Sequence, residues 1–341
     1  MKTTIKDVAR ESGFSIATVS LALSAKPNRI AKKTKEKIIH IANQLNYSPN
    51  RVAVSLATRK SRMIGLVIAD VRNAHIASMF MAIDIELQKS GYILLCCTIT
   101  NDPSCMATGV RNLIACGVDG IIFCQPDFVV PSKYDIEVIN QIERSGLPVV
   151  SRDNLNAEMR GVGVRFDFFL GGYMATKHLI ENGHRKIGCV AGPPEYRVTL
   201  ERLNGYKLAL QEAGIEFDQK LVYVGDYELE SGSDALPYLL GQKVTAIFAF
   251  NDQMAFGIYR SARNYGIKIP QDLSVIGFDD VMFSDVLEVP LTSINVPTVE
   301  IGVTVAQEMI NLIENGIPQE PKVITFEPNL MIRRSTLKIN P

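Results

Sequence analysis

The side chains with the clearest chemical meaning in this sequence are the Lys and Arg residues near its start. Residues 1–62 contain 13 Lys and Arg but three Asp and Glu. The other 279 residues contain 23 Lys and Arg and 33 Asp and Glu. The formal net charge of zero therefore hides a basic segment followed by an acidic one. Clustered cations neutralise nucleic-acid phosphates and release their counterions. We expect residues 1–62 to bind DNA. Apolar residues at helical spacing favour a folded module over a basic tail.

Patterns typical of enzymes and metal sites are not found. The sequence has no GxxxxGK[ST] or HExxH motif, and no Ser-His-Asp arrangement stands out. We therefore expect no catalytic residues, no metal and no cofactor. The cysteines lack paired CxxC spacing and fall mostly in apolar runs, which indicates buried, reduced thiols in a cytoplasmic protein. They are Cys96, Cys97, Cys105, Cys116, Cys124 and Cys189.

Secretion and membrane insertion are not expected either. No apolar run reaches the roughly 18 residues of a membrane span, and the start MKTTIKDVAR lacks the apolar stretch of a signal peptide. Two other functional classes are the alternatives to a DNA-binding regulator. A solute-binding protein needs a secretion signal and has no basic segment. A sugar-metabolising enzyme with an added DNA-binding module needs a phosphate loop or a catalytic constellation.

Helix signals explain how the basic segment is folded. Thr4 followed by Asp7 predicts a helix start, and Gly13 predicts the end of that helix. Ser15 can cap a second helix over 16–23. Two short helices joined by a Gly-containing turn form a helix-turn-helix, in which the second helix enters the major groove. The spacing of apolar residues predicts a third helix over 35–45.

These segments also resemble a known family. TIKDVARESGFSIATVSLALS and TKEKIIHIANQLNYSPNRVAVSL are similar to the lac/galactose repressor family of bacterial transcription regulators. The resemblance implies that residues just after the capping serine read base edges. Leu21 stands where the family commonly has Arg, so an operator read through thymine methyls and DNA shape is expected; the alternative is that Leu21 is a core residue. The DNA-binding residues implied are Thr4, Ser15, Ile16, Ala17, Thr18, Ser20, Leu21, Arg29, Asn50 and Leu56.

Two further features of the basic segment follow from this comparison. Ala31 stands where a capping Ser is usual before the third helix, and the nearby lysines are interpreted as phosphate contacts. Ser48-Pro49 predicts the start of a short hinge helix, which is too short to persist alone in water. The resemblance implies that this helix folds on DNA and inserts Leu56 into the minor groove. Alternatively, Leu56 packs only within the hinge.

From residue 63 onward, short apolar runs alternate with amphipathic stretches. Strands are predicted in 63–69, 92–97, 120–124, 147–150, 186–191, 246–250 and 274–278, and helices in 77–90, 172–181, 202–213 and 254–265. This alternation predicts an α/β fold with two doubly wound parallel-sheet subdomains, which bind ligands at strand ends. The resemblance, carried by KHLIENGHRKIGCVAGP and IPQDLSVIGFDD, implies a periplasmic-binding-protein-like body. We expect a helix-turn-helix domain over 1–47, a hinge over 48–62, and subdomains over 63–161 with 292–320 and over 162–291 with 321–336.

The same resemblance implies the effector-binding residues, which are Asp153, Phe166, Arg197, Tyr227, Asn251, Asp252 and Asp279. The alternatives to ligand binding are helix capping for Asp252 and a purely structural role for Asp279. Leu200 stands where the family usually has a clamping Arg, so either Arg197 reaches in from the loop or the effector does not need the clamp.

The function expected is that of a transcriptional regulator, most simply a repressor, controlled by a small effector such as a sugar or related metabolite. The sequence has no leucine-heptad tail after Thr336, so we expect a homodimer on a palindromic double-stranded operator.

Overall fold

The computed structural model describes residues 3–23, 29–48, 60–68, 70–98, 103–124, 128–130, 133–152 and 161–339. The chain divides into two compact units, an N-terminal unit, Met1–Arg62, and a body, Met63–Pro341. Asn50, Leu56 and Asp153, which the sequence analysis singled out, lie outside the described residues.

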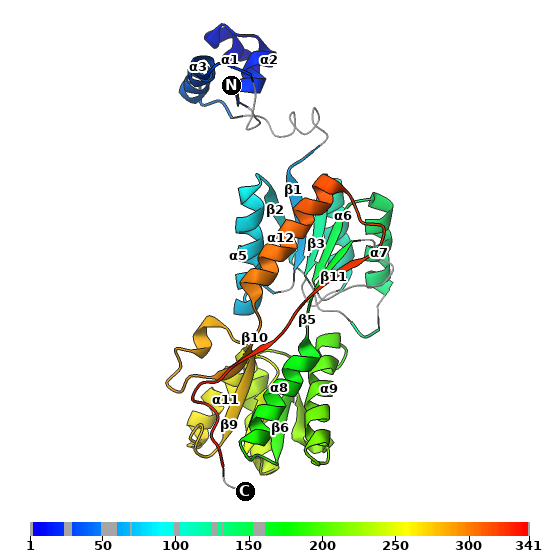
Figure 1. Cartoon of the computed structure of the whole chain (residues 1–341), viewed down its shortest axis with the longest axis vertical. Coiled ribbons are helices and arrows are strands. Elements are labelled where there is room, and N and C mark those ends of the chain that lie inside the picture. Colours follow the sequence, from blue (N-terminus) through cyan, green and yellow to red (C-terminus); the bar gives the residue numbers. More distant parts are fainter. Residues whose placement is uncertain are drawn as a thin grey trace. The chain divides into compact units, whose positions relative to one another are not determined.

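The N-terminal unit contains three helices around a small apolar core (Figure 1). They are α1 (Ile5–Ser12), α2 (Ile16–Leu23) and α3 (Lys32–Gln44). Asp7 accepts hydrogen bonds from the backbone N–H and hydroxyl of Thr4 at 3.0 and 2.7 Å, and Gly13 ends α1 with φ of 76°. The Ser15 hydroxyl accepts from the N–H of Thr18 at 3.2 Å, so it caps α2 as expected. Local capping interactions therefore define the two ends of α1 and the start of α2 in the helix-turn-helix.

The first half of the body is a six-stranded parallel sheet with the order β11-β5-β4-β3-β1-β2. Its strands are β1 (Met63–Ile68), β2 (Ile93–Thr98), β3 (Gly120–Cys124), β4 (Val149–Arg152), β5 (Val162–Phe166) and β11 (Lys322–Phe326). Helices α5 (Ala74–Lys89) and α12 (Thr298–Asn315) pack together, as do α6 (Pro103–Ala115) and α7 (Lys133–Ser145) (Figure 1). Separate apolar clusters lie under the two helix pairs, so the sheet is buried on both faces.

The second half repeats this architecture in the order β12-β10-β9-β8-β6-β7, with β12 antiparallel to β10. Its strands are β6 (Ile187–Ala191), β7 (Val222–Val224), β8 (Ala246–Ala249), β9 (Ser274–Asp279), β10 (Thr292–Asn295) and β12 (Asn329–Met331). Helices α8 (Phe168–Glu181) and α9 (Arg197–Glu212) pack against each other, as do α10 (Leu229–Gly241) and α11 (Asp252–Tyr265). Two short 3₁₀ helices are η1 (Gln219–Leu221) and η2 (Met282–Ser284).

The expected subdomain boundaries were wrong in three places. β5 and β11 belong to the first sheet, although 162–166 and 322–326 were expected in the second subdomain. β10 belongs to the second sheet, although 292–295 was expected in the first. A short apolar run predicts a buried strand but carries no information about its pairing partner, so the three crossings between the sheets were misplaced.

The helices α5, α8, α9 and α11 also begin earlier than their apolar periodicity suggested. Asn73, Asp167 and Asn251 accept hydrogen bonds from backbone N–H groups at the starts of α5, α8 and α11. A side-chain cap extends a helix beyond its apolar stripe because it satisfies a backbone N–H that would otherwise lack a partner. These earlier starts move Ala74, Phe168 and Asp252 from expected loops into helices.

The close approach of α8 and α9 requires glycine. A Cβ atom on Gly172 would lie 2.3 Å from the carbonyl oxygen of Arg202, and one on Gly205 would lie 2.1 Å from that of Phe169. Because these contacts are to backbone atoms, a side chain cannot move away to relieve them. The glycines therefore fix the position of the α9 backbone at Arg202.

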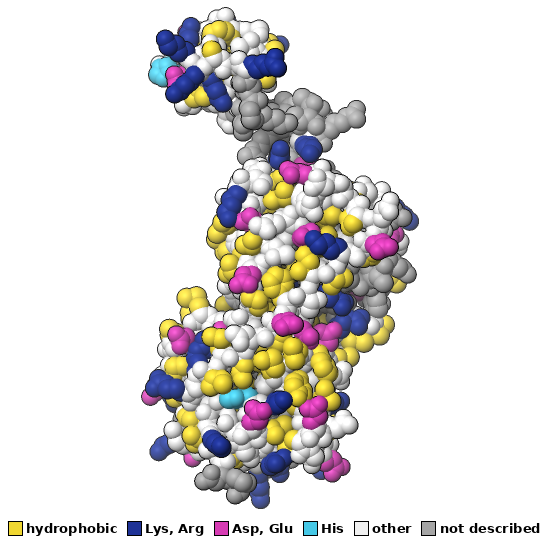
Figure 2. All heavy atoms as spheres, in the orientation of Figure 1, with side chains coloured by type: hydrophobic (Ala, Val, Ile, Leu, Met, Phe, Trp, Pro, Cys, Tyr) yellow, Lys and Arg dark blue, Asp and Glu magenta, His cyan; other side chains and the backbone are white. Residues whose placement is uncertain are grey.

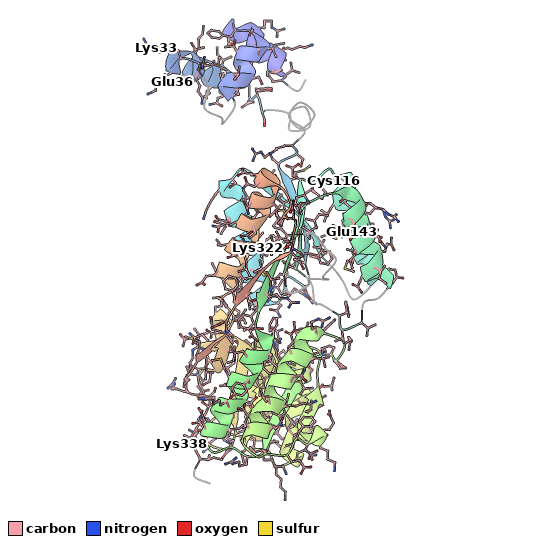
Figure 3. The ribbon with its side chains drawn as sticks, turned by 45° about the vertical axis from the view of Figure 1, so that its right-hand side comes forward. Lys33, Glu36, Cys116, Glu143, Lys322 and Lys338 are labelled. Atoms are coloured by element: carbon pink, nitrogen blue, oxygen red, sulfur yellow. The ribbon has the colours of Figure 1, made fainter. Side chains whose placement is uncertain are left out.

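The burial of the cysteines was only partly as expected. All six are free, and Cys124 and Cys189 are buried, but Cys96, Cys105 and Cys116 are exposed (Cys116 in Figure 3). Cys116 directly follows α6, in the turn that leads to β3, and its neighbours Ala115 and Gly117 are exposed as well. Among the described helices, none combines the length and apolar character needed to cross a membrane.

Candidate DNA-binding and effector sites

Helix α2 presents two exposed apolar side chains on the surface of the N-terminal unit. Ile16 is 46% exposed and Leu21 is 51% exposed, and Ala17 and Ser20 between them are also exposed. The core of the unit is instead supplied from α2 by Val19 and Ala22. Large exposed apolar residues on a small helix are typical of a binding surface. This position does not fit the alternative that Leu21 is a core residue.

Several cationic side chains lie on the face of this unit that Figure 2 shows. Arg29, Lys32 and Lys33 are exposed, and Lys33 and Glu36 lie on the outside of α3 (Figure 3). Ala31 precedes α3 without a capping hydrogen bond, as the sequence indicated. Exposed cations suit contacts to phosphates, which position a protein on DNA without reading its sequence.

A second candidate site lies in the body, where strands of both sheets end. His75 follows β1 in the first turn of α5, and Asp279 is the last residue of β9. Arg202 reaches the same place from α9. Each of the three side chains is more than nine-tenths buried. His75 Nδ1 lies 3.8 Å and Arg202 Nη2 lies 3.7 Å from Asp279 Oδ1. Both distances are too long for hydrogen bonds, so the three side chains converge without closing on one another.

Aromatic rings and one carbonyl hold the Arg202 guanidinium. Its Nη1 donates to the carbonyl oxygen of Phe250 at 2.7 Å, and its Cζ lies 4.0 Å from the ring centre of Phe278 and 4.8 Å from that of Phe168. The Tyr227 ring lies 5.7 Å away. Contacts of a cation with aromatic faces partly replace its lost hydration. Arg202 Nε nevertheless has no hydrogen-bond partner among the described residues.

The protonation of His75 follows from its neighbours. Burial and the guanidinium groups of Arg152 and Arg202 lower its pKa well below the usual value, so the imidazole is neutral. Arg152 Nη2 lies 3.3 Å from His75 Nε2. A guanidinium only donates, so Nε2 accepts and the proton lies on Nδ1. Nδ1 is buried without a hydrogen-bond partner among the described residues. Burial raises the pKa of Asp279 to about 6, although Arg202 and Arg152 oppose that shift.

Asn251 and Tyr227 support this cluster from the neighbouring strand ends. Asn251 Oδ1 accepts from the N–H of Met254 at 2.8 Å, and its Nδ2 donates to the carbonyl oxygen of Tyr227 at 2.8 Å. The Tyr227 hydroxyl lies 2.7 Å from that of Thr199, and burial raises its pKa. Tyr227 has φ of 71° and Asp279 has φ of 102°. Such backbone conformations are costly outside glycine and are found at functional sites as well as in turns.

Effector binding and helix capping were the two roles expected for Asp252, and the structure gives it a different one. It is the first residue of α11 rather than its cap, which is Asn251. Its carboxylate accepts from the hydroxyls of Ser284 and Ser293 at 2.5 and 2.6 Å and from the N–H of Val281 at 2.9 Å. It is completely buried. Asp252 therefore ties α11 to η2 and β10, and its oxygens are already occupied.

Phe166 and Arg197 line another pocket, of about 240 Å³, beside β5, β11 and the starts of α8 and α9. The Phe166 ring packs edge-on against Phe168, with centres 5.1 Å apart. Arg197 is exposed. Arg202, rather than Arg197, is the arginine beside Asp279, and a ligand-binding role for Arg197 stays a proposal. Sequence reasoning also missed His75, Arg152 and Phe168. Arg202 could have been found from the sequence. It lies three residues before Gly205, almost one helical turn, so both residues lie on the same face of the helix.

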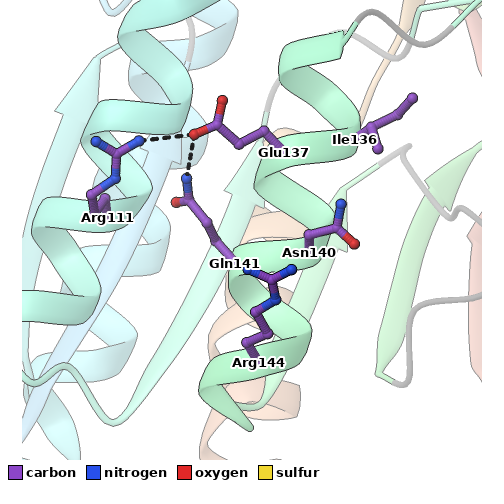
Figure 4. Close-up of a pocket in the computed structure, with 6 residues that line it drawn as sticks. All are labelled: Arg111, Ile136, Glu137, Asn140, Gln141 and Arg144. Carbon is purple, nitrogen blue, oxygen red and sulfur yellow. Dashed lines mark hydrogen bonds and ion pairs between the residues drawn. The ribbon is translucent and has the colours of Figure 1, made fainter.

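A pocket of about 460 Å³ also lies between α6 and α7, but none of the predicted residues line it (Figure 4). Glu137 accepts from Arg111 Nη2 at 2.8 Å and from Gln141 Nε2 at 3.0 Å. The polar side chains of this pocket are therefore largely hydrogen-bonded to one another. Among the described residues, no group of three or more His, Cys, Asp or Glu is arranged to hold a metal.

Comparison with known proteins places this architecture in a class. Residues 176–336 match the periplasmic binding protein-like domain, and residues 4–50 match the bacterial regulatory proteins of the lacI family. Together they define a DNA-binding regulator with a ligand-binding type of body. The chain is 34% identical over 340 residues to the HTH-type transcriptional repressor PurR of Actinobacillus pleuropneumoniae serotype 3 (strain JL03), covering 99% of each chain. The chain belongs to the lacI family of bacterial regulatory proteins.

Solved structures agree with this assignment. The Lac repressor dimer bound to operator and the anti-inducer ONPF is 26% identical, with a TM-score of 0.85 over 99% of this chain and 100% of that chain. The complex of the transcriptional regulator CelR with cellobiose is 28% identical, with a TM-score of 0.71 over 98% and 100%. The α/β fold and the resemblance stated from the sequence are confirmed. The chain is a transcriptional regulator, and its relatives include the transcriptional repressor PurR, a ribose operon repressor and the transcriptional regulator DegA, none of which is an enzyme by name.

The exposed position of Leu21 yields a test of apolar base reading. We expect Leu21→Ala to lower affinity for an operator found by in vitro selection by about 1–2 kcal/mol, because several buried methyl and methylene groups are lost. Replacing thymine by uracil in that operator removes only methyl groups. It should weaken wild-type binding more than Leu21→Ala binding in fluorescence anisotropy. Ile39→Ala, which removes an exposed side chain of α3, is the control. Equal losses for wild type and Leu21→Ala on the uracil operator would contradict methyl contact.

The buried carboxylate of Asp252 yields a pH dependence. Burial and the nearby Asp279 raise its pKa to about 7, against the opposing hydrogen bonds. The folded state then binds more protons than the unfolded state between the two pKa values, so this group's contribution to stability falls as pH rises. The difference in unfolding free energy between wild type and Asp252→Asn should shrink by about 1 kcal/mol per pH unit from pH 5 to 7. Urea unfolding measures it, with exposed Asp234→Asn as control. A pH-independent difference would contradict the raised pKa of Asp252.

Proposed function

We propose that this protein represses transcription by binding a palindromic operator as a homodimer in the cytoplasm, and that a small effector in the body controls operator affinity. The DNA-binding surface is proposed to be α2, with Ile16, Ala17, Ser20 and Leu21 facing the bases. The effector is proposed to bind between Asp279, Arg202 and His75. Tyr227 and Asn251 support that site, and Asp153 and Leu56 retain their expected roles as proposals.

The observation that carries this proposal is the convergence of buried polar groups from both sheets. His75 Nδ1 and Arg202 Nε are buried without hydrogen-bond partners among the described residues. Leaving such groups unsatisfied is costly, and a bound ligand would satisfy them. His75 belongs to the first half of the body, and Arg202 and Asp279 belong to the second. A ligand that contacts all three would favour one relative arrangement of the two halves, and it could shift the regulator between two states.

The chemistry of the site suits a small polar metabolite with an apolar face. A carboxylate and a guanidinium can bridge hydroxyl groups, while the rings of Phe168, Phe278 and Tyr227 surround the guanidinium. Sugars combine hydroxyl edges with apolar ring faces. The complex of the related CelR with cellobiose supports this class.

A thermal-shift screen of sugars and nucleobases on the full chain tests the effector site. An effector at one hundred times its Kd should stabilise the protein by about 2.7 kcal/mol and change its affinity for operator DNA. Asp279→Ala should abolish the shift, because it removes the carboxylate at the centre of the cluster. The exposed Asp234→Ala should retain it. A compound that still binds after changes at Asp279 and at Arg202 would place the effector elsewhere.

Two exposed apolar surfaces support the proposed homodimer. Met81 and Ile85 lie one turn apart on α5 and are 51% and 52% exposed. Met282 and Val286, in and beside η2, are about three-quarters exposed. Hydrophobic side chains gather over α5 and over the loop containing η2 in Figure 2. Apolar patches of this kind mark association surfaces, and the related Lac repressor is a dimer on its operator.

Placing a charge on the exposed apolar surface formed by Met81 and Ile85 of α5 tests the proposed homodimer. Ile85→Glu should produce monomers in analytical ultracentrifugation at micromolar concentration, since an unpaired carboxylate would be buried in the interface. Its operator affinity should fall because one half-site no longer assists the other. Ile136→Glu on α7, which is similarly exposed, should remain dimeric. The α5 interface is wrong if Ile85→Glu sediments like Ile136→Glu.

A further inference from the structure

Two cysteines in the first half of the body lie where α6 packs against β2. Cys97 is near the end of β2, and Cys105 is in the first turn of α6. The Cys97 side chain packs against the apolar cluster that contains Met106 and Val110 of α6. Side chains alternate between the two faces of a strand, so Cys97 points toward α6 and Cys96 toward the opposite face. The thiols at the contact of α6 with β2 are therefore those of Cys97 and Cys105.

A glycine of α6 lets the Cys97 sulfur approach the helix closely. A Cβ atom on Gly109 would lie 2.0 Å from Cys97 Sγ and 3.4 Å from Cys97 Cβ. The sulfur thus occupies the place that a side chain at this position would take. Cys105 precedes Gly109 by one helical turn, and residues at that spacing share a face of the helix, with Cβ atoms about 5–6 Å apart. Cys97 Sγ is therefore one turn of α6 away from the Cys105 side chain.

The remaining separation between the two thiols is small. Because the Cα–Cβ bonds of a helix tilt toward its N-terminus, the position above Gly109 leans toward the turn that contains Cys105. Burial and the neighbouring Cys105 thiol both raise the pKa of Cys97, so the two sulfurs lie within range of each other's charge. Helix ends fray. The first turn of α6 can therefore make the movement that brings two Cβ atoms to the about 3.5–4.5 Å of a disulfide.

Solvent reaches this pair of thiols from the outer side of α6. Cys105 is exposed and Cys97 is partly exposed, whereas Cys124 and Cys189 are buried. Helix α5, which carries the proposed dimer surface, packs on the other face of the sheet and belongs to the other apolar cluster. A second copy bound at α5 would therefore leave Cys105 accessible to a small oxidant.

We infer that Cys105 and Cys97 form a reversible disulfide when the protein meets hydrogen peroxide, with Cys105 reacting first. The Cys105 sulfur attacks one peroxide oxygen, the O–O bond breaks, and the departing oxygen takes the thiol proton and leaves as water. The Cys97 sulfur then attacks the sulfenic acid on Cys105. The S–S bond forms, the S–O bond breaks, and the hydroxide leaves with the Cys97 proton as a second water. Two thiols and one peroxide thus give one disulfide and two waters.

The order of the two steps follows from burial. Exposed thiols meet peroxide first, and the more buried Cys97 is protected until a sulfenic acid forms beside it. Disulfides in reducing compartments are usually transient and redox-sensing. This one would fasten the first turn of α6 to β2, an edge strand of the first sheet. Neither cysteine belongs to the proposed effector or DNA-binding surface, so failure of the proposed function would leave this site untouched.

Mass spectrometry of the full-length protein tests the disulfide. Trypsin alone leaves Cys96, Cys97 and Cys105 in one peptide, 90–111, but a further cut before Asp102 with endoproteinase Asp-N separates Cys105 from the other two. The reduced protein is treated with hydrogen peroxide, its free thiols are alkylated, and both proteases are applied. We expect peptides 90–101 and 102–111 to be joined by a bond that dithiothreitol breaks.

Single-cysteine variants assign the bond to its two residues. Cys97→Ser and Cys105→Ser should each lose the joined peptides. In Cys97→Ser the sulfenic acid on Cys105 should persist and react with dimedone, because no second thiol removes it. Cys96→Ser and Cys116→Ser change exposed cysteines outside the pair, and they should form the bond like wild type.

Three results would overturn the pair. Joined peptides that survive in Cys97→Ser would assign Cys96 as the partner instead. A bond found only between two chains on a non-reducing gel would exclude an internal disulfide. Peroxide-treated wild type without joined peptides, with Cys105 unchanged or converted to sulfonic acid, would exclude the reaction. Because wild type alone decides whether the bond forms, a variant that fails to fold does not remove the test.

Discussion

The body is organised around one buried cation. The Arg202 guanidinium is almost fully removed from water, and burying an isolated charge in a protein interior is strongly unfavourable. The surrounding structure compensates in three ways, with the Phe250 carbonyl, the rings of Phe278 and Phe168, and the nearby Asp279 carboxylate. None of these saturates the guanidinium. The Nε group of Arg202 remains buried without a hydrogen-bond partner among the described residues.

Holding the cation there imposes conditions on elements far apart in the sequence. Glycines at the α8–α9 contact let the two backbones touch, which fixes the base of the Arg202 side chain. Asp279 sits at the end of β9 in a strained backbone conformation, and Asp280 after it also has positive φ. Asp252 accepts the N–H of Val281 and the hydroxyls of Ser284 and Ser293, and so it stabilises that strained turn. A carboxylate expected to touch the effector instead supports the backbone beside it.

The sequence predicted some parts of this arrangement well and others poorly, for physical reasons. Caps such as Ser15 and the end of the first helix at Gly13 are local, so they could be read directly from the chain. The alternation of apolar runs and amphipathic stretches was enough for two doubly wound sheets. Sheet membership of β5 and β10 depends on long-range pairing, which no local pattern encodes. His75 was missed because its helix begins before its apolar stripe, so the residue was assigned to a loop. Arg152 was missed because it lies directly before Asp153, where only the acid was expected to matter.

The position of His75 also connects the proposed effector site with the proposed dimer surface. His75 lies in the first turn of α5, whose start is fixed by the Asn73 cap, and Met81 and Ile85 are exposed further along the same helix. A helix of 16 residues moves largely as a rigid element, since its backbone hydrogen bonds and its packing against α12 resist bending. A ligand that draws His75 toward Asp279 would therefore displace the surface that faces a second copy. In the proposed dimer, whose two N-terminal units would bind two half-sites, such a displacement would change operator affinity without any contact between effector and DNA.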